Sequence, residues 1–265
     1  MYSADSGAMD LTDTTLDRRD WIAGIEKGLR MLEVFDGTHS RLTASEAGKL
    51  TDMTRTAARR HLLTLAHLGY VGTDGKLFWL TPRVLRLGQA YLDSSRLARI
   101  VQPFLQRITA GTHEAAYVSV MDGDDVVYIA RSGANRAMNT GFVLGARMPA
   151  QVTASGLMLL AQRDEDAIGR WLDSRSLTAF TSYTIASKER LQVELLRVRQ
   201  QGYALSEQQI DLYYRGVAVA LRNSKGEVVG AVNVTMPIGH ETAEDAIRRT
   251  LPVLRETVQA MRGML

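Results

Sequence analysis

The nine residues TRTAARRHL, at positions 54–62, constrain the fold most, because they carry three arginines and no acidic residue. At about 100° per residue of an α-helix, the arginines fall within one arc and most apolar residues within the opposite one. The first arc holds Arg55, Thr56, Arg59, Arg60 and Leu63, and the second holds Ala58, His61, Leu62, Leu65 and Leu68. Such a helix can pack one face on a core while three guanidinium groups face outward.

The helix alone leaves two interpretations of this outward face open. An ordinary solvated helix mixes charges of both signs and gains from acid–base pairs three or four residues apart. Here Arg55 and Arg59 are like charges four residues apart with no acidic partner, which is mildly unfavourable in an isolated helix. Nucleic-acid binding is the alternative, and the surrounding sequence has to decide between the two.

The charge of the chain is unevenly distributed. Residues 21–100 carry 12 Lys and Arg against 7 Asp and Glu, whereas residues 1–20 carry 2 against 5. Residues 101–265 are nearly balanced, with 18 basic residues against 17 acidic ones. The excess positive charge therefore belongs to one segment, as expected of a module that approaches a polyanion.

Composition excludes several classes of protein. A chain of 265 residues is long enough for two domains with separate cores. It contains no apolar run long enough to span a membrane, no recognisable signal peptide and no cysteine. Disulfides, thiol catalysis and cysteine zinc sites are thus absent, and a cytoplasmic location is expected.

The segment around the basic helix predicts a winged helix-turn-helix. Thr43 can cap a short helix with Glu46 in a capping-box spacing, and the four residues TDMT form the turn before the basic helix. The stretch GYVGTDGKLFWLTP then alternates apolar and polar residues around Asp74-Gly75, which predicts a hairpin. The expected DNA-contacting residues are Thr43, Thr54, Arg55, Thr56, Arg59, Arg60 and Lys76.

Three segments carry a family resemblance: GIEKGLRMLEVFD, LTASEAGKLTDMTRTAARRHLLTLAHLGYV and FWLTPRVLRLGQAYL. They closely resemble the IclR-type bacterial transcriptional regulators, and more narrowly the subgroup that controls protocatechuate, 4-hydroxybenzoate and β-ketoadipate catabolism. The resemblance runs from residue 22 to the C-terminus and is most specific in the N-terminal module. It implies a DNA-binding module joined by a helix to a GAF-like effector-binding domain, assembled as dimers or tetramers.

The joint between the modules is expected to be one helix over residues 82–101. Its apolar residues Val84, Leu87, Tyr91, Ala98 and Val101 form a stripe near heptad spacing. The stripe favours packing against a second copy, which would match two recognition helices to the repeat of DNA. A helix lying on its own domain is the alternative.

Beyond the joint, short strands alternate with helices. Hairpins are expected at Asp122-Gly123 and Lys225-Gly226, and a weaker strand over AMNTGFVLG, residues 137–145. Helices are expected to begin at Thr153, near residue 187 and at Thr242. This pattern predicts an α+β sensor-like domain with an antiparallel sheet.

Little in the second module suggests catalysis. The histidines at 39, 61, 67, 113 and 240 lack metal-ligand spacing, and neither a P-loop nor G-x-S-x-G occurs. Ser155-Gly156 does not fit a nucleophile elbow. The sequence therefore predicts no enzyme, no metal site and no cofactor.

A small-carboxylate site is expected where Thr153, Ala154, Ser155 and Gly156 begin a helix, because the first amides of a helix are free donors. A plain capped helix packed on a sheet is the alternative. The family resemblance implies that the amides of Ala154 and Ser155 hold the anion. It adds side-chain positions at Ser206, Gly216, Asn233 and Thr235.

Arginines and tyrosines complete the expected site. Arg147 and Arg215 are candidate carboxylate partners or structural ion-pair residues. Tyr213 and Tyr214 can stack on an aromatic ligand or simply pack. Relatives of the aromatic-acid subgroup read close to CTAMGRVLLA where this chain has VTASGLMLLA, and Gly216 lacks the side chain that some relatives place there. These departures concern the identity of the ligand.

The sequence thus predicts an α+β regulator of four segments: a disordered tail (1–20), a winged helix-turn-helix (21–81), a linker and dimerisation helix (82–101) and an effector-binding domain (102–265). The expected partners are an operator duplex, a small carboxylate, most simply an aromatic acid, and further copies of the chain. The alternatives are a constitutive repressor whose second domain only oligomerises, or an enzyme or protein-binding sensor.

Overall fold

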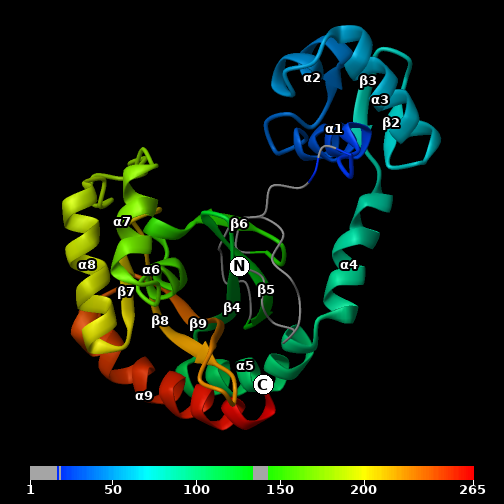
Figure 1. Ribbon diagram of the computed structural model, residues 1–265. Coiled ribbons are helices and arrows are strands. Elements are labelled where there is room, and N and C mark those ends of the chain that lie inside the picture. Colours follow the sequence, from blue (N-terminus) through cyan, green and yellow to red (C-terminus); the bar gives the residue numbers. More distant parts are fainter. Residues whose placement is uncertain (1–16, 18, 134–142) are drawn as a thin grey trace. The chain divides into compact units, whose positions relative to one another are not determined.

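The computed structural model describes residues 17, 19–133 and 143–265 (Figure 1). Contacts between these residues divide the chain into two compact units, one ending at Ser94 and the other spanning Ser95–Leu265. Most of the expected tail and residues 137–142 of the expected strand lie outside the described residues. The last three residues of that strand, 143–145, form a bend and turn.

The first unit is a helix-turn-helix followed by a hairpin, as the sequence predicts. Its helices are α1 (Ala23–Glu33), α2 (Ala44–Leu50), α3 (Arg55–His67) and α4 (Leu85–Ser94), with a 3-10 turn at Pro82–Val84. Its strands β1 (Leu42–Thr43), β2 (Val71–Thr73) and β3 (Leu77–Leu80) form an antiparallel sheet in the order β1-β3-β2.

Local hydrogen bonds explain where α2 and α3 begin. The Thr43 hydroxyl accepts from the amide of Glu46 (3.3 Å), whose carboxylate accepts from the Thr43 amide (2.7 Å). The Thr54 hydroxyl accepts from the amide of Ala57 at 3.2 Å. Ala58, Leu62 and Leu65 of α3 are buried as the periodicity predicts, whereas Leu68 follows the end of the helix and is about half exposed.

The expected single linker helix over 82–101 is wrong, because α4 ends at Ser94. Ser95 adopts an extended backbone, and its hydroxyl accepts from the amide of Ala98 at 3.3 Å, so it caps a new helix, α5 (Arg96–Thr112). α4 has no buried residue. Ala98 and Val101, by contrast, are buried in the second unit.

The second unit contains a six-stranded antiparallel sheet in the order β6-β5-β4-β9-β8-β7. Its strands are β4 (Ala115–Asp122), β5 (Asp125–Ser132), β6 (Arg147–Pro149), β7 (Ala204–Glu207), β8 (Tyr214–Arg222) and β9 (Val228–Pro237). Its helices are α5, α6 (Ala154–Leu160), α7 (Glu165–Asp173), α8 (Lys188–Gln201) and α9 (Ala243–Met261), with 3-10 turns at Ala150–Val152 and Arg262–Met264. Both expected hairpins are present.

Each face of the sheet packs on different helices (Figure 1). Val217, Val219 and Leu221 of β8 pack with α5 and α9, whereas Ala218 packs with α6 and α8. The alternation is that of an extended strand, whose successive side chains point to opposite faces. It puts Gly216 on the α6 face, and a Cβ there would lie 3.3 Å from the Cβ of Ala154.

In the part of the chain that the structure describes, no helix combines the length and apolar character needed to cross a membrane.

Candidate functional site

The outward face of α3 carries the three arginines that the sequence places there. Arg55, Thr56, Arg59 and Arg60 are exposed, and α3 has no acidic residue in its first turn. None of the three guanidinium groups has an ion-pair partner among the described residues. The face is therefore a cluster of three cations on one side of α3 that no described acidic residue neutralises.

The other residues expected to contact DNA have mixed roles. Thr43 is engaged in the capping box, where its hydroxyl also donates to Glu46 at 2.8 Å, so it has a structural role at the start of α2. Thr54 caps α3 but is exposed. Lys76 is exposed in the hairpin turn, where its amide donates to Asp74 at 2.9 Å.

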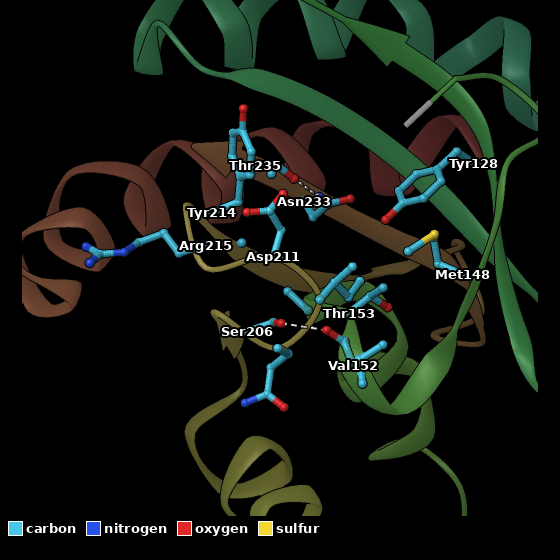
Figure 2. Close-up of a pocket in the computed structure, with 14 residues that line it drawn as sticks. Tyr128, Met148, Val152, Thr153, Ser206, Asp211, Tyr214, Arg215, Asn233 and Thr235 are labelled. Carbon is cyan, nitrogen blue, oxygen red and sulfur yellow. Dashed lines mark hydrogen bonds between the residues drawn. The ribbon is translucent and has the colours of Figure 1, made fainter. Parts of the chain in front are cut away.

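A second candidate site is a cavity of about 210 Å³ on the α6 face of the large sheet (Figure 2). It is lined by Tyr128, Met148, Val152, Thr153, Ala154, Ser206, Gln209, Ile210, Asp211, Tyr214, Arg215, Gly216, Asn233 and Thr235. Eight of these are expected from the sequence. Those that sequence reasoning missed come from β5, β6, the turn before α6 and the loop between β7 and β8.

A chain of buried polar side chains runs along one wall of this cavity. The Ser155 hydroxyl donates to Asn233 Oδ1 at 2.8 Å, and Asn233 Nδ2 donates to Thr235 Oγ1 at 3.1 Å. The Ser206 hydroxyl donates to the carbonyl of Val152 at 2.7 Å. Since Thr235 accepts a bond here, its own O–H remains available to a ligand.

The start of α6 offers backbone donors. The Thr153 hydroxyl accepts from the Gly156 amide at 2.9 Å, so that amide is already satisfied. The amides of Ala154 and Ser155 have no acceptor among the described residues. Gly156 has a packing role instead, because a Cβ there would lie 2.1 Å from the carbonyl oxygen of Ala150. Two of the four expected residues thus supply free N–H groups.

Neither expected arginine presents its charge to the cavity. The buried Arg215 guanidinium extends away from it (Figure 2), with Nε 2.9 Å from Glu207 Oε2 and Nη1 donating to the Glu241 carbonyl at 3.0 Å. Arg147 pairs with Asp122 and Asp125 beside the β4–β5 hairpin, outside the lining. The interpretation of both as structural ion-pair residues fits these positions, and that of carboxylate partners does not.

Tyrosines contribute unequally to the cavity. Tyr213 is 72% exposed and does not line it, contrary to the stacking role considered for it, whereas Tyr214 does. Tyr128 is buried, and its ring meets that of Tyr117 edge to face with centroids 5.3 Å apart. Burial raises the pKa of Tyr128, so its hydroxyl stays protonated at neutral pH.

Chemically, the cavity can bind a small molecule with an apolar body and an acceptor group such as a carboxylate. Its walls are mainly apolar, and its donors are neutral amides and hydroxyls. Across the described ranges, no group of three or more His, Cys, Asp or Glu side chains could hold a metal ion.

Family models match both units. Residues 24–75 match the model described as "IclR helix-turn-helix domain", and residues 89–262 match "Bacterial transcriptional regulator IclR C-terminal".

Individual relatives match most of the chain. The Pca operon regulatory protein of Acinetobacter baylyi is 37% identical over 250 residues, covering 93% of this chain and 90% of that protein. The p-hydroxybenzoate hydroxylase transcriptional activator of the same organism is 36% identical over 251 residues, with 93% of each covered.

A solved structure resembles the second unit. It is a double mutant of the PobR inducer-binding domain from Acinetobacter in complex with 3-hydroxybenzoic acid. It is 30% identical with a TM-score of 0.61, and the match covers 64% of this chain and all of that one.

Proposed function

Because the chain belongs to the IclR family of bacterial transcriptional regulators, we propose that it binds its operator through α3 and senses a small aromatic carboxylate in the cavity beside α6. Like its relatives, it is a ligand-responsive DNA-binding regulator and not an enzyme. The finer assignments, of the effector and of the residues that bind it, are the proposal.

The observation that carries the effector assignment is that free amides at the start of α6 and apolar walls occur in the same cavity. The amides of Ala154 and Ser155 and the hydroxyl of Thr235 can hold carboxylate oxygens. Met148, Val152 and Ile210 line the cavity and suit a ring. The volume of about 210 Å³ lies below that of pockets for drug-sized ligands, which favours a single-ring molecule.

The relatives support an aromatic acid. One is named for activating p-hydroxybenzoate hydroxylase, and the solved inducer-binding domain holds 3-hydroxybenzoic acid. Because the relative named for p-hydroxybenzoate hydroxylase is 36% identical over 93% of the chain, a hydroxybenzoate or a near metabolite is the effector we propose.

On the DNA side, we assign Arg55 and Thr56, at the start of α3, to base edges in the major groove. Arg59 and Arg60 are assigned to phosphates or to the deeper groove. Operators with two half-sites require a dimer or tetramer. We assign the interface between the copies to the apolar face of α4. We also assign the regulator to the cytoplasm, because its partner there would be the bacterium's DNA.

A screen of the full-length protein tests this function. Thermal unfolding would be followed with benzoate, hydroxybenzoates, phenylpropanoids and short dicarboxylates, and hits would be added to an operator gel-shift assay. A ligand at 100 times its Kd stabilises the folded state by about 2.7 kcal/mol. We expect an aromatic acid to stabilise the protein and change operator affinity. Stabilisation by dicarboxylates alone contradicts the aromatic assignment, and no hit at all supports the constitutive repressor.

A further inference from the structure

We propose that Asp211 determines effector specificity by requiring a hydrogen-bond donor on the ligand, an inference that rests on the proposed function. Only two of the described residues lining the cavity carry a formal charge, Asp211 and Arg215. The Arg215 guanidinium is paired with Glu207 and extends away from the cavity. Asp211 is therefore the only charge that the described lining presents to a ligand.

The loop between β7 and β8 holds this carboxylate in place. Its backbone is fixed where the Gln208 amide donates to the Tyr214 carbonyl (3.0 Å) and the Thr184 hydroxyl to the Gln209 carbonyl (2.6 Å). The Gln209 side chain is also engaged, since its Oε1 accepts from the Ile185 amide at 2.8 Å. The loop thus rests on the neighbouring segment, residues 181–185.

Within that loop, the two carboxylate oxygens of Asp211 differ in their contacts. Oδ1 accepts from the amide of Tyr213 at 2.9 Å, which limits the rotation of the carboxylate. Oδ2 has no hydrogen-bond donor among the described residues. Figure 2 shows the side chain among those that line the cavity. The cavity therefore contains a positioned acceptor to which no described residue donates.

The chemistry of this acceptor selects the ligand. A carboxylate only accepts hydrogen bonds, and like charges repel. The ligand's own carboxylate is thereby directed to the amides of Ala154 and Ser155, and the ligand atom that reaches Oδ2 must be a hydrogen-bond donor. A phenolic hydroxyl meets this requirement, whereas a ring carbon or fluorine leaves Asp211 desolvated and unpaired, which is costly.

The first test uses the unmodified protein and matched ligand pairs. Calorimetry would compare 2-, 3- and 4-hydroxybenzoate with the fluorobenzoate substituted at the same position, which is similar in size but has no donor. We expect the best-bound hydroxybenzoate to bind at least about tenfold more tightly than its fluoro counterpart, because a hydrogen bond to a charged group contributes about that difference in affinity.

The second test changes the acceptor. In Asp211→Asn the amide oxygen can still accept from Tyr213, but an NH₂ group replaces the free oxygen. The preference for hydroxyl over fluorine is expected to fall to about twofold or less. Asp211→Ser is a second variant whose hydroxyl can accept from the same amide. Asp166→Asn, at an exposed position of α7, removes an equal charge elsewhere and should keep the wild-type preference.

The outcomes separate this inference from the proposed function. If no benzoate binds the wild-type protein, the aromatic-acid proposal fails, and the assignment of Asp211 with it. If benzoates bind but each hydroxyl and fluoro pair binds equally, Asp211 does not select the effector and the proposed function stands. A variant that weakens both members of a pair by the same factor would show a structural role only and overturn the inference.

Discussion

The backbone around Gly156 leaves no room for a side chain, because α6 begins directly against the preceding turn. A Cβ would lie 2.1 Å from the oxygen and 2.4 Å from the Cα of Ala150. Gly156→Ala should lower the free energy of unfolding by about 1–3 kcal/mol, because the added methyl group overpacks this site. Urea denaturation measures the change, and Gly169→Ala in α7, where a Cβ meets nothing within 4 Å, serves as the control. An unchanged midpoint for Gly156→Ala would contradict this packing.

Arginines on one helix face can be told apart by the way their loss affects binding. Arg55→Ala should relax discrimination at one or two base pairs by about 1–3 kcal/mol. Arg60→Ala should weaken binding to all sequences alike and reduce the salt slope by about one phosphate contact. Arg190→Ala, exposed on α8 in the second unit, is the control for lost charge. A double Arg55→Ala/Arg60→Ala variant that shifts the operator as the parent does would rule out α3 as the recognition helix.

Glu241 gives the second unit a pH-dependent stability. The hydrogen bond from Arg249 (2.9 Å) holds the pKa of Glu241 below its ordinary value of 4.5. Because the folded-state pKa is lowered, the pair stabilises the fold above about pH 4.5, and that contribution is lost as the pH falls through the lowered value. Glu241→Gln should cost about 0.5–1 kcal/mol at pH 7, since both side chains are about one-third exposed. Melting temperatures of both proteins from pH 7 to 3 should converge, and a constant difference would contradict the assignment.

At the level of the elements, the sequence predicts what local interactions determine. Thr43 and Thr54 specify where α2 and α3 start, because capping bonds span three residues. The break at Ser95 was missed because the apolar stripe continues across it, although the Asp93-Ser94-Ser95 run offers a new cap. Strand alternation also argues against Arg215 as a carboxylate partner in the cavity, since Arg215 and Gly216 are neighbours on β8 and face opposite sides of the sheet.

The rest of the site depends on contacts between distant residues. Tyr128 on β5 and Asp211 in the β7–β8 loop reach the cavity only because the sheet order brings β5, β4, β9, β8 and β7 together. The sequence next to Tyr128 is that of an ordinary core residue, and the sequence next to Asp211 is that of an ordinary turn residue, so neither indicates a ligand contact. Local pattern could therefore predict the α6 end of the cavity, and the family resemblance added positions on β7, β8 and β9, but neither identified Tyr128 or Asp211.

α4 is the element expected to join two copies of the chain. It has no buried residue, and its apolar side chains are left at the surface: Leu87 is 53% exposed and Tyr91 is 39% exposed. Leu87→Asp/Tyr91→Asp would bury charge in an apolar seam and should reduce dimer formation and operator affinity together. Sedimentation velocity and gel shifts measure both, and Gln89→Asp, on the opposite side of the helix, should change neither greatly. A fully dimeric double variant would exclude α4 as the interface.

For the whole molecule, a ligand can change operator affinity only by its different affinity for the two conformations. Variants of the cavity should therefore separate sensing from DNA binding. Asn233 is buried and links Ser155 to Thr235, so Asn233→Leu removes polar groups from the cavity wall without touching α3. Ser155→Pro removes one of the two free amides at the start of α6, together with the hydroxyl that donates to Asn233. Proline is tolerated in a first helical turn, so α6 can still form.

Both variants are expected to bind the operator as the wild-type apo-protein does, because α3 and its capping bonds are unchanged. The effector, however, should no longer raise the melting temperature of either variant or change its operator affinity. Calorimetry, thermal unfolding and gel shifts on the same preparations test this, with circular dichroism to establish that each variant is folded. An unchanged ligand affinity in both would mean that the effector binds elsewhere. Lost ligand affinity with a retained operator response would mean that the response does not pass through this cavity.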